Sequence, residues 1–226
     1  MATWIAHLRI ANYFLDKIPA EHVKDFIVGN IGPDSGVPNI DWTVFTPSTD
    51  ISHWRKIPLP GRDEKEIDFE SFYSKYLNDN RIGKWFYVGY YIHLLSDYYW
   101  GQLIYLPKYE KILDDMKENK EFIWRIKKDW YDLDFEYINN YKDKLNSFTL
   151  FNTILEYDNK YLDYFPEHAF TQKIKYIQEF YKEKRDLKKK KYEYLNREDM
   201  DYYINEACKS IEIILTSKNL TIASTG

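Results

Sequence analysis

A histidine and an aspartate stand four residues apart, at His93 and Asp97, in the stretch YYIHLLSDYYW, which is otherwise almost wholly apolar and aromatic. Residues four apart lie on the same face of a helix, so these two side chains point the same way. Apolar residues occupy the rest of the helix surface, which predicts a buried helix. Because a buried carboxylate costs several kcal/mol unless it is paired or bound to a metal, the spacing predicts either a His–Asp hydrogen bond or a metal site.

Three further residues could complete such a site. His7 falls on the apolar face of a predicted first helix, Asp34 lies in the loop GNIGPDSG, and His53 lies in TDISHWRK. Each alone is more typical of a structural residue, either a core histidine or the aspartate of an Asx turn. Together with His93 and Asp97 they form an imidazole and carboxylate set of the kind that binds Zn²⁺, Fe, Mn²⁺ or Ni²⁺. We therefore expect His7, Asp34, His53, His93 and Asp97 to be metal ligands.

The elements that position these residues are predicted to be helical. Apolar periodicity predicts helices over 4–18, 19–29, 67–78, 82–105, 108–141 with a break, 147–164, 167–184 and 197–217. Residues 36–65 predict a long loop, which is often functional in a compact domain, and KKYEYL could form one short strand. The expected fold is an all-α, single-domain, multi-helix bundle over residues 1–226, with the metal-site half at about 1–110 and the C-terminal helices at about 108–217.

Composition limits the classes of protein to consider. The net charge is −4, which gives no overall attraction to nucleic acid, and we expect no stable nucleic acid partner. The only cysteine, Cys208, excludes an internal disulfide and a cysteine zinc site and fits a reducing compartment. The chain has no run of about 18 apolar residues, so we expect no transmembrane segment. His7 and Arg9 interrupt the apolar region that a signal peptide would need. The expected location is the cytoplasm.

The order of these segments, AHLRIANYFLD, GNIGPDSG, ISHW and YYIHLLSD, resembles the zinc-dependent phospholipase C family over about residues 4–110. Fungal single-strand nucleases share that fold. The resemblance implies an all-α fold in which up to three zinc ions lie at the bottom of a cleft and phosphate esters are hydrolysed by a metal-activated water. It implies that Asp34, His53, His93 and Asp97 hold one metal, and that His7 and Asp97 hold a second with Asp97 as the bridge. Asp34 and Asp97 are then the catalytic residues, with Asp34 orienting the water.

The sequence also departs from the family pattern. The histidine expected six residues after the bridging aspartate is Leu103, and a further H-x-x-x-E motif reads Leu106 to Glu110, so the third metal site is expected to be absent. Exported members of the family use the free amino group of an N-terminal tryptophan as a metal ligand. Here residues 1–3 precede Trp4, so we expect no such ligand from it. We expect one or two zinc ions, with Fe, Mn or Ni as alternatives. Glu110 and His168 are candidates for an extra ligand.

The substrate is less defined by the sequence. Arg55 is a candidate for binding a phosphate, as are its neighbour Lys56 and Arg9. We expect a small intracellular phosphomonoester or phosphodiester. The alternative is a catalytically degenerate metal-binding or structural protein of the same fold, and Leu103 and Leu106 favour it. HD-type phosphohydrolases fit less well because no histidine is followed directly by aspartate, and the oligomeric state stays open.

Overall fold

The structure is a computed structural model that describes residues 1–58, 65–78, 83–109, 119–185, 187 and 190–220 of the 226-residue chain. It is mainly helical, which confirms the expected all-α class. The helices are α1 (Trp4–Phe14), α2 (Val23–Ile31), α3 (Thr49–Ser52), α4 (Phe69–Tyr76), α5 (Lys84–Trp100), α6 (Leu106–Tyr109), α8 (Lys120–Tyr141), α9 (Asn146–Phe151), α10 (Ala169–Phe180) and α11 (Arg197–Ser217). Short helical turns are the 3-10 helices η1 (Leu15–Lys17), η2 (Ala20–His22), η3 (Gly32–Asp34) and η6 (Lys142–Lys144) and the π-helical turn η4 (Gly101–Tyr105).

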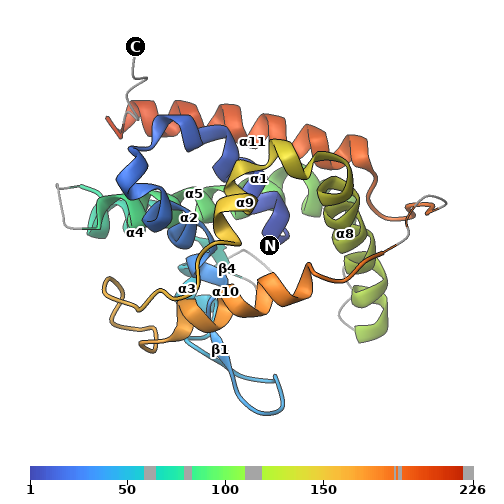
Figure 1. Cartoon of the computed structure of the whole chain (residues 1–226), viewed down its shortest axis with the longest axis horizontal. Helices are drawn as coiled ribbons and strands as arrows, with labels where there is room; N and C mark the ends of the chain where they lie inside the picture. Colours follow the sequence, from blue (N-terminus) through green and yellow to red (C-terminus); the bar gives the residue numbers. More distant parts are fainter. Residues whose placement is uncertain (59–64, 79–82, 110–118, 186, 188–189, 221–226) are drawn as a thin grey trace.

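The helices pack around α5, which is buried along most of its length. In Figure 1, α11 runs along the top of the molecule and α10 along the bottom, while α1, α2, α5 and α9 lie between them and α8 stands at one side. The buried apolar residues form one cluster that extends from Ala2 to Leu220, and many of its largest members are aromatic. The aromatic residues that are frequent in this sequence therefore serve mainly to fill the core.

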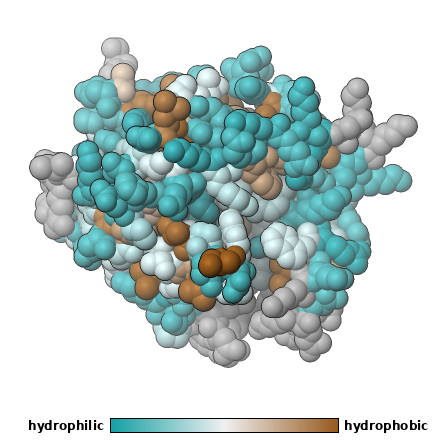
Figure 2. All heavy atoms as spheres, turned by 60° about the horizontal axis from the view of Figure 1, so that its bottom comes forward, coloured by the Kyte–Doolittle hydropathy of each residue, from teal (hydrophilic) through white to brown (hydrophobic). Residues whose placement is uncertain are grey.

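Two small antiparallel sheets interrupt the predicted loop of residues 36–65. β1 (Val37–Pro38) pairs with β2 (Phe45–Thr46), and β3 (Arg55–Pro58) pairs with β4 (Lys65–Ile67) in a register that shifts between Arg55 and Ile57. The β1–β2 hairpin projects from the bottom of the molecule (Figure 1). The face that carries it, turned forward in Figure 2, shows apolar side chains in small groups separated by hydrophilic ones.

Two glycines allow α2 and α5 to touch through their backbones. A Cβ atom added to Gly89 would lie 2.1 Å from the carbonyl oxygen of Phe26, and one added to Gly29 would lie 2.0 Å from that of Phe86. Neither distance leaves room for a side chain, so the crossing requires glycine on both helices. The contact places the end of α2 directly beside the middle of α5.

Several predicted elements are corrected by the structure. The helix expected over 147–164 ends at Phe151, where the side chains of Asn152 and Thr153 donate to the carbonyl oxygens of Phe148 and Leu150, and side chains further along the chain also bind the backbone. The Asn159 carboxamide, for example, accepts from the backbone N–H groups of Tyr161 and Leu162 and donates to the carbonyl oxygen of Phe165. The helix expected over 167–184 is the shorter α10, whereas α11 matches its predicted bounds.

The strand expected at KKYEYL, residues 190–195, is not formed. Its backbone amides at Glu193 and Tyr194 instead donate to the carboxylate of Asp129 on α8. Glu110 and most of the predicted break within 108–141 lie outside the described residues. None of the described helices combines the length and the apolar character that crossing a membrane requires.

Candidate metal centre

Five predicted ligands from four separate segments converge at the end of α2 and the middle of α5. His7 comes from α1, Asp34 closes η3 directly after α2, His53 follows α3, and His93 and Asp97 lie one turn apart on α5. All three histidines and Asp97 are buried. Their ligand atoms fall into two overlapping groups, His7 with His93 and Asp97, and Asp34 with His53 and His93, in which all atoms lie within 4.8 Å of one another.

Four distances among Asp34, His53, His93 and Asp97 are close to those between the ligands of a tetrahedral ion. The Nε2 atom of His53 lies 3.3 Å from Asp34 Oδ1, 3.4 Å from His93 Nε2 and 3.5 Å from Asp97 Oδ2. His93 Nε2 lies 3.6 Å from the same Asp97 oxygen. Ligands bound tetrahedrally to zinc at about 2.0–2.1 Å are separated from one another by about 3.3–3.4 Å. We call Asp34, His53, His93 and Asp97 the four-ligand set.

The outer hydrogen bonds of the histidines direct their Nε2 lone pairs inward. His93 donates from Nδ1 to the carbonyl oxygen of Asn30 at 2.7 Å, so Nδ1 carries the proton and Nε2 does not in the neutral ring. The hydroxyl of Ser52 donates to the carbonyl oxygen of Thr49 and therefore accepts from His53 Nδ1 at 3.0 Å. This is the arrangement that second-shell groups impose on metal-binding histidines.

His7 is held in the same way. The Ser96 hydroxyl donates to the carbonyl oxygen of His93 and accepts from His7 Nδ1, at 2.8 Å in both cases. The His7 ring stacks on the His93 ring with a centroid separation of 3.7 Å. Among the described residues, neither His7 Nε2 nor Asp97 Oδ2 has a hydrogen-bond partner, although both atoms are buried. Buried lone pairs that face one another without a donor are costly, and a cation would relieve that cost.

The two carboxylate oxygens of Asp97 face different ligand residues. Oδ2 faces His53 and His93, whereas Oδ1 lies 3.4 Å from His7 Nε2 and accepts from the backbone N–H of Ala2 at 2.8 Å. The carboxylate is thus oriented as a bridge between two positions. The position beside His7 has fewer ligand atoms, and one of them already accepts a hydrogen bond, so the four-ligand set is the more complete site.

Electrostatics in the centre favour charged carboxylates and largely neutral imidazoles. Burial lowers the pKa of His53, and burial together with the neighbouring His93 lowers that of His7 to about 4. Burial alone would raise the pKa of Asp97, but the charge of the amino terminus and then the contacts with His7 and His93 lower it well below the usual range. Burial also opposes the charged form of His93, but the contact with Asp97 outweighs it and raises the pKa of His93. The site therefore attracts positive charge.

The four-ligand set opens into a cleft of about 890 Å³. Asp34 and His53 line it, together with the start of the chain, the β1–β2 and β3–β4 sheets, η4 and one face each of α8 and α10. Arg55, Lys127 and Lys173 are cationic residues of its wall.

Other residues that the sequence proposed lie elsewhere. His168 is exposed and contacts Asp158 at 3.1 Å, it does not line the cleft, and it belongs to neither ligand group. Lys56 lies over the ring of Trp54, 3.7 Å from its centroid, and Leu103 does not line the cleft, whereas Leu106 does. Glu110 lies outside the described residues.

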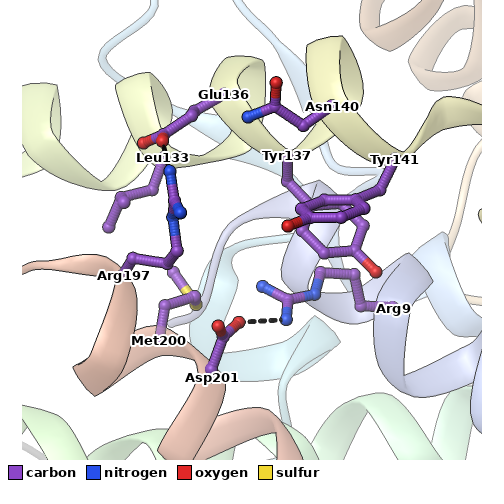
Figure 3. Close-up of a pocket in the computed structure, with 9 residues that line it drawn as sticks. All are labelled: Arg9, Leu133, Glu136, Tyr137, Asn140, Tyr141, Arg197, Met200 and Asp201. Carbon is purple, nitrogen blue, oxygen red and sulfur yellow. Dashed lines mark hydrogen bonds and ion pairs between the residues drawn. The ribbon is translucent and has the colours of Figure 1, made fainter.

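Arg9 faces a separate, far smaller pocket between α1, α8 and α11, with a volume of about 20 Å³ (Figure 3). Its guanidinium pairs with Asp201 at 2.5 Å and lies 3.9 Å from the ring centroid of Tyr137. Arg197 forms an ion pair with Glu136 in the same pocket. The charged groups of this pocket are thus paired with one another, and Arg9 is not a residue of the cleft.

Some residues of the centre were not singled out by the sequence. Ser52 and Ser96 each stand directly before a ligand, and a hydroxyl residue next to a ligand is a usable signal. The carbonyl of Asn30 leaves no signal because it belongs to the backbone. Lys127 and Lys173 lie outside the segments that resemble the phospholipase C family, and only the folding of α8 and α10 onto the cleft brings them to it.

Comparisons of the chain with models of protein families, with curated proteins and with solved structures return no match.

Proposed function

We propose that this chain is a metal-dependent hydrolase of phosphate esters and a divergent relative of the zinc-dependent phospholipase C family. Asp34, His53, His93 and Asp97 would hold the main ion, with zinc the best fit to two imidazoles and two carboxylates at tetrahedral spacing. The observation that carries the proposal is the convergence of these ligand atoms at a cleft that has cationic walls.

When bound, a divalent ion would supply a Lewis acid for the phosphoryl oxygen and lower the pKa of a water molecule. The residues of the chain have separate parts in this reaction. Both ligand carboxylates line the cleft, but the side chain of Asp34 is 9% accessible and that of Asp97 only 1%, so we assign to Asp34 the orientation of the attacking water. Arg55 faces the same cleft and is suited to bind phosphate oxygens.

A second candidate is a metal-binding protein that has no turnover. Leu106 lines the cleft at a position where the family resemblance would require a histidine ligand. An incomplete ion cluster binds metal but stabilises the transition state of phosphate ester hydrolysis less well. This candidate predicts metal in the purified protein without hydrolysis of any phosphate ester.

Elemental analysis and a phosphatase screen separate these candidates. We expect purified protein to contain close to one zinc or other divalent ion per chain, and to hydrolyse generic phosphate esters when Zn²⁺, Mn²⁺ or Ni²⁺ is added. His53→Ala and His93→Ala should abolish both properties. His168→Ala, which removes an exposed histidine outside the centre, is the matched control and should retain them. A wild-type protein that binds no divalent ion at micromolar concentration would refute the proposal.

A further inference from the structure

Three cations in the cleft wall have no counter-ion among the described residues. Arg55 comes from β3, Lys127 from α8 and Lys173 from α10, so three unrelated segments bring positive charge to one space. None of the three forms an ion pair within the described ranges of the chain. Lys65, a fourth cation of the wall, is already paired with Asp50 at 3.4 Å. Unpaired positive charge in a concave, partly buried site is suited to binding an anion.

The surroundings of these cations indicate that they are not ordinary surface charges. The Nε atom of Arg55 is buried and has no hydrogen-bond partner in the part of the chain that is described. Burial lowers the pKa of Lys127 and of Lys173, and for both the charge of Asp34 acts in the opposite direction. Asp34 belongs to the four-ligand set, so both ammonium groups lie within electrostatic reach of the metal centre.

The charge of the cleft depends on what the centre holds. Among the described residues, the side-chain cations of the cleft without an ion pair are Arg55, Lys127 and Lys173, and its carboxylates are Asp34, Asp97 and Glu66. Met1 also lines the cleft, and burial lowers the pKa of its amino group, which favours the neutral form. Without an ion these side-chain charges cancel. One divalent ion in the four-ligand set leaves a net charge of about +2, which matches a dianion better than a monoanion.

We propose that Arg55, Lys127 and Lys173 form a receptor for a phosphoryl group with two negative charges, and that the cleft therefore selects phosphomonoesters over phosphodiesters. The turnover part of this inference rests on the proposed function, whereas the binding of the dianion does not. A phosphomonoester carries close to two negative charges at pH 7 because its second pKa is about 6, and a phosphodiester carries one. The monoester also offers three terminal oxygens to three donors.

The reaction of such a substrate balances simply. The oxygen of water forms a new bond to phosphorus while the bond from phosphorus to the ester oxygen breaks. One proton of the water passes by way of Asp34 to the leaving oxygen, so the products are an alcohol and inorganic phosphate. The three cations act on the non-bridging oxygens and exchange no proton or electron.

The test combines anion binding with turnover in metal-loaded protein. Calorimetry should give inorganic phosphate an affinity at least about tenfold higher than dimethyl phosphate. In the double variant Lys127→Gln/Lys173→Gln, we expect phosphate affinity and the kcat/KM for 4-nitrophenyl phosphate to fall by about 100-fold, because two charge-assisted contacts to the phosphoryl oxygens are lost. The kcat/KM for bis(4-nitrophenyl) phosphate should fall by less than about fivefold.

The matched control is Lys128→Gln/Lys175→Gln, which removes two exposed lysines from the same helices and outside the cleft. It should stay within about twofold of the wild type in every measurement. Glutamine keeps much of the side-chain length, and thermal melting of each variant checks that the fold is intact.

The outcomes separate this inference from the proposed function. If neither ester is hydrolysed but phosphate binds more tightly than dimethyl phosphate and the Lys127/Lys173 variant loses that preference, the hydrolase proposal fails and the dianion receptor stands. If esters are hydrolysed but the two double variants behave alike, or dimethyl phosphate binds as well as phosphate, the receptor is overturned and the hydrolase stands.

Discussion

Two groups of largely buried aspartates in this molecule are surrounded by different kinds of atoms. Asp129, Asp132 and Asp134 lie within six residues on α8, whereas Asp34 and Asp97 belong to the metal centre. Hydrogen-bond donors or cations surround each aspartate of α8. The aspartates of the centre face the lone pairs of imidazole nitrogens.

The α8 group is satisfied by the chain itself. Asp129 accepts from two backbone amides and pairs with Lys190 at 3.0 Å, and Asp132 pairs with Arg185 at 3.0 Å. Asp134 accepts from the hydroxyls of Thr3 and Tyr181, both at 2.6 Å. In contrast, Asp97 has one buried oxygen without any donor in the described structure. Burial of a carboxylate therefore does not by itself indicate a metal site. The atoms that face the carboxylate distinguish a structural role from metal binding.

The largest expected effect is on the centre. Asp97→Asn replaces a carboxylate that faces three imidazoles with a neutral amide, so bound metal should be lost and any phosphate ester turnover should fall by at least about 1,000-fold, more than the loss of an outer-shell partner causes. Elemental analysis and kcat/KM measure both effects. If Asp97→Asn kept its metal while Asp129→Asn lost it, the contrast between the two groups would be wrong.

The next effect concerns pH. Burial raises the pKa of Asp134 to about 7 despite the two hydroxyl donors. Below about pH 4 the carboxyl is protonated in both the folded and the unfolded chain, and its contribution to stability is complete. As pH rises to about 7, the unfolded chain loses its proton first, and the free energy of unfolding should fall by about 4 kcal/mol. Asp134→Asn cannot ionise, so the difference between its denaturation curves and those of the wild type across this range should isolate the effect.

A smaller effect is expected from Asp129→Asn. The amide keeps one acceptor oxygen but loses the charge that pairs with Lys190, so the free energy of unfolding should fall by about 3 kcal/mol. Chemical denaturation gives the value, and metal content should not change. A variant as stable as the wild type would mean that this carboxylate is dispensable for the fold.

The smallest effect tests the outer contacts of the centre. Ser52→Ala removes the acceptor of His53 Nδ1, which leaves the ring free to turn, and zinc affinity should fall by about tenfold. Competition with a chromogenic chelator measures the affinity. Ser217→Ala, which removes an exposed hydroxyl at the end of α11, should leave it unchanged.

The helical class follows from local patterns in the sequence, whereas the meeting of distant ligands was expected from their residue types and from the family resemblance. The spacing of His93 and Asp97 on an apolar helix is a periodic signal. The start of α11 has a capping box, formed by Asn196 and Asp199, whose residue types and spacing are visible in the sequence. The end of α9 at Phe151 was not predicted, because it goes with a hydrogen bond from the Asn152 carboxamide to the carbonyl oxygen of Phe148. The sequence shows that asparagine is present but not which groups it reaches.

Details of the site were harder to predict for a related reason. The Nε2 orientation of His93 depends on a backbone carbonyl, and the cations Lys127 and Lys173 depend on two helices from the second half of the chain. Such contacts join residues far apart in sequence and have no periodic signature. The aspartates of α8 resemble ligands in composition, and only their donors identify them as structural.

The contact between α2 and α5 at Gly29 and Gly89 ties the centre to the motion of the core. Asn30, whose carbonyl orients His93, follows one of these glycines directly, and His93 lies one turn after the other. A fluctuation that separates the two helices therefore also dismantles the ligand set. Ion release and local opening of this helix pair become one event, so the dissociation rate of the metal should follow the amide hydrogen exchange of α2 and α5.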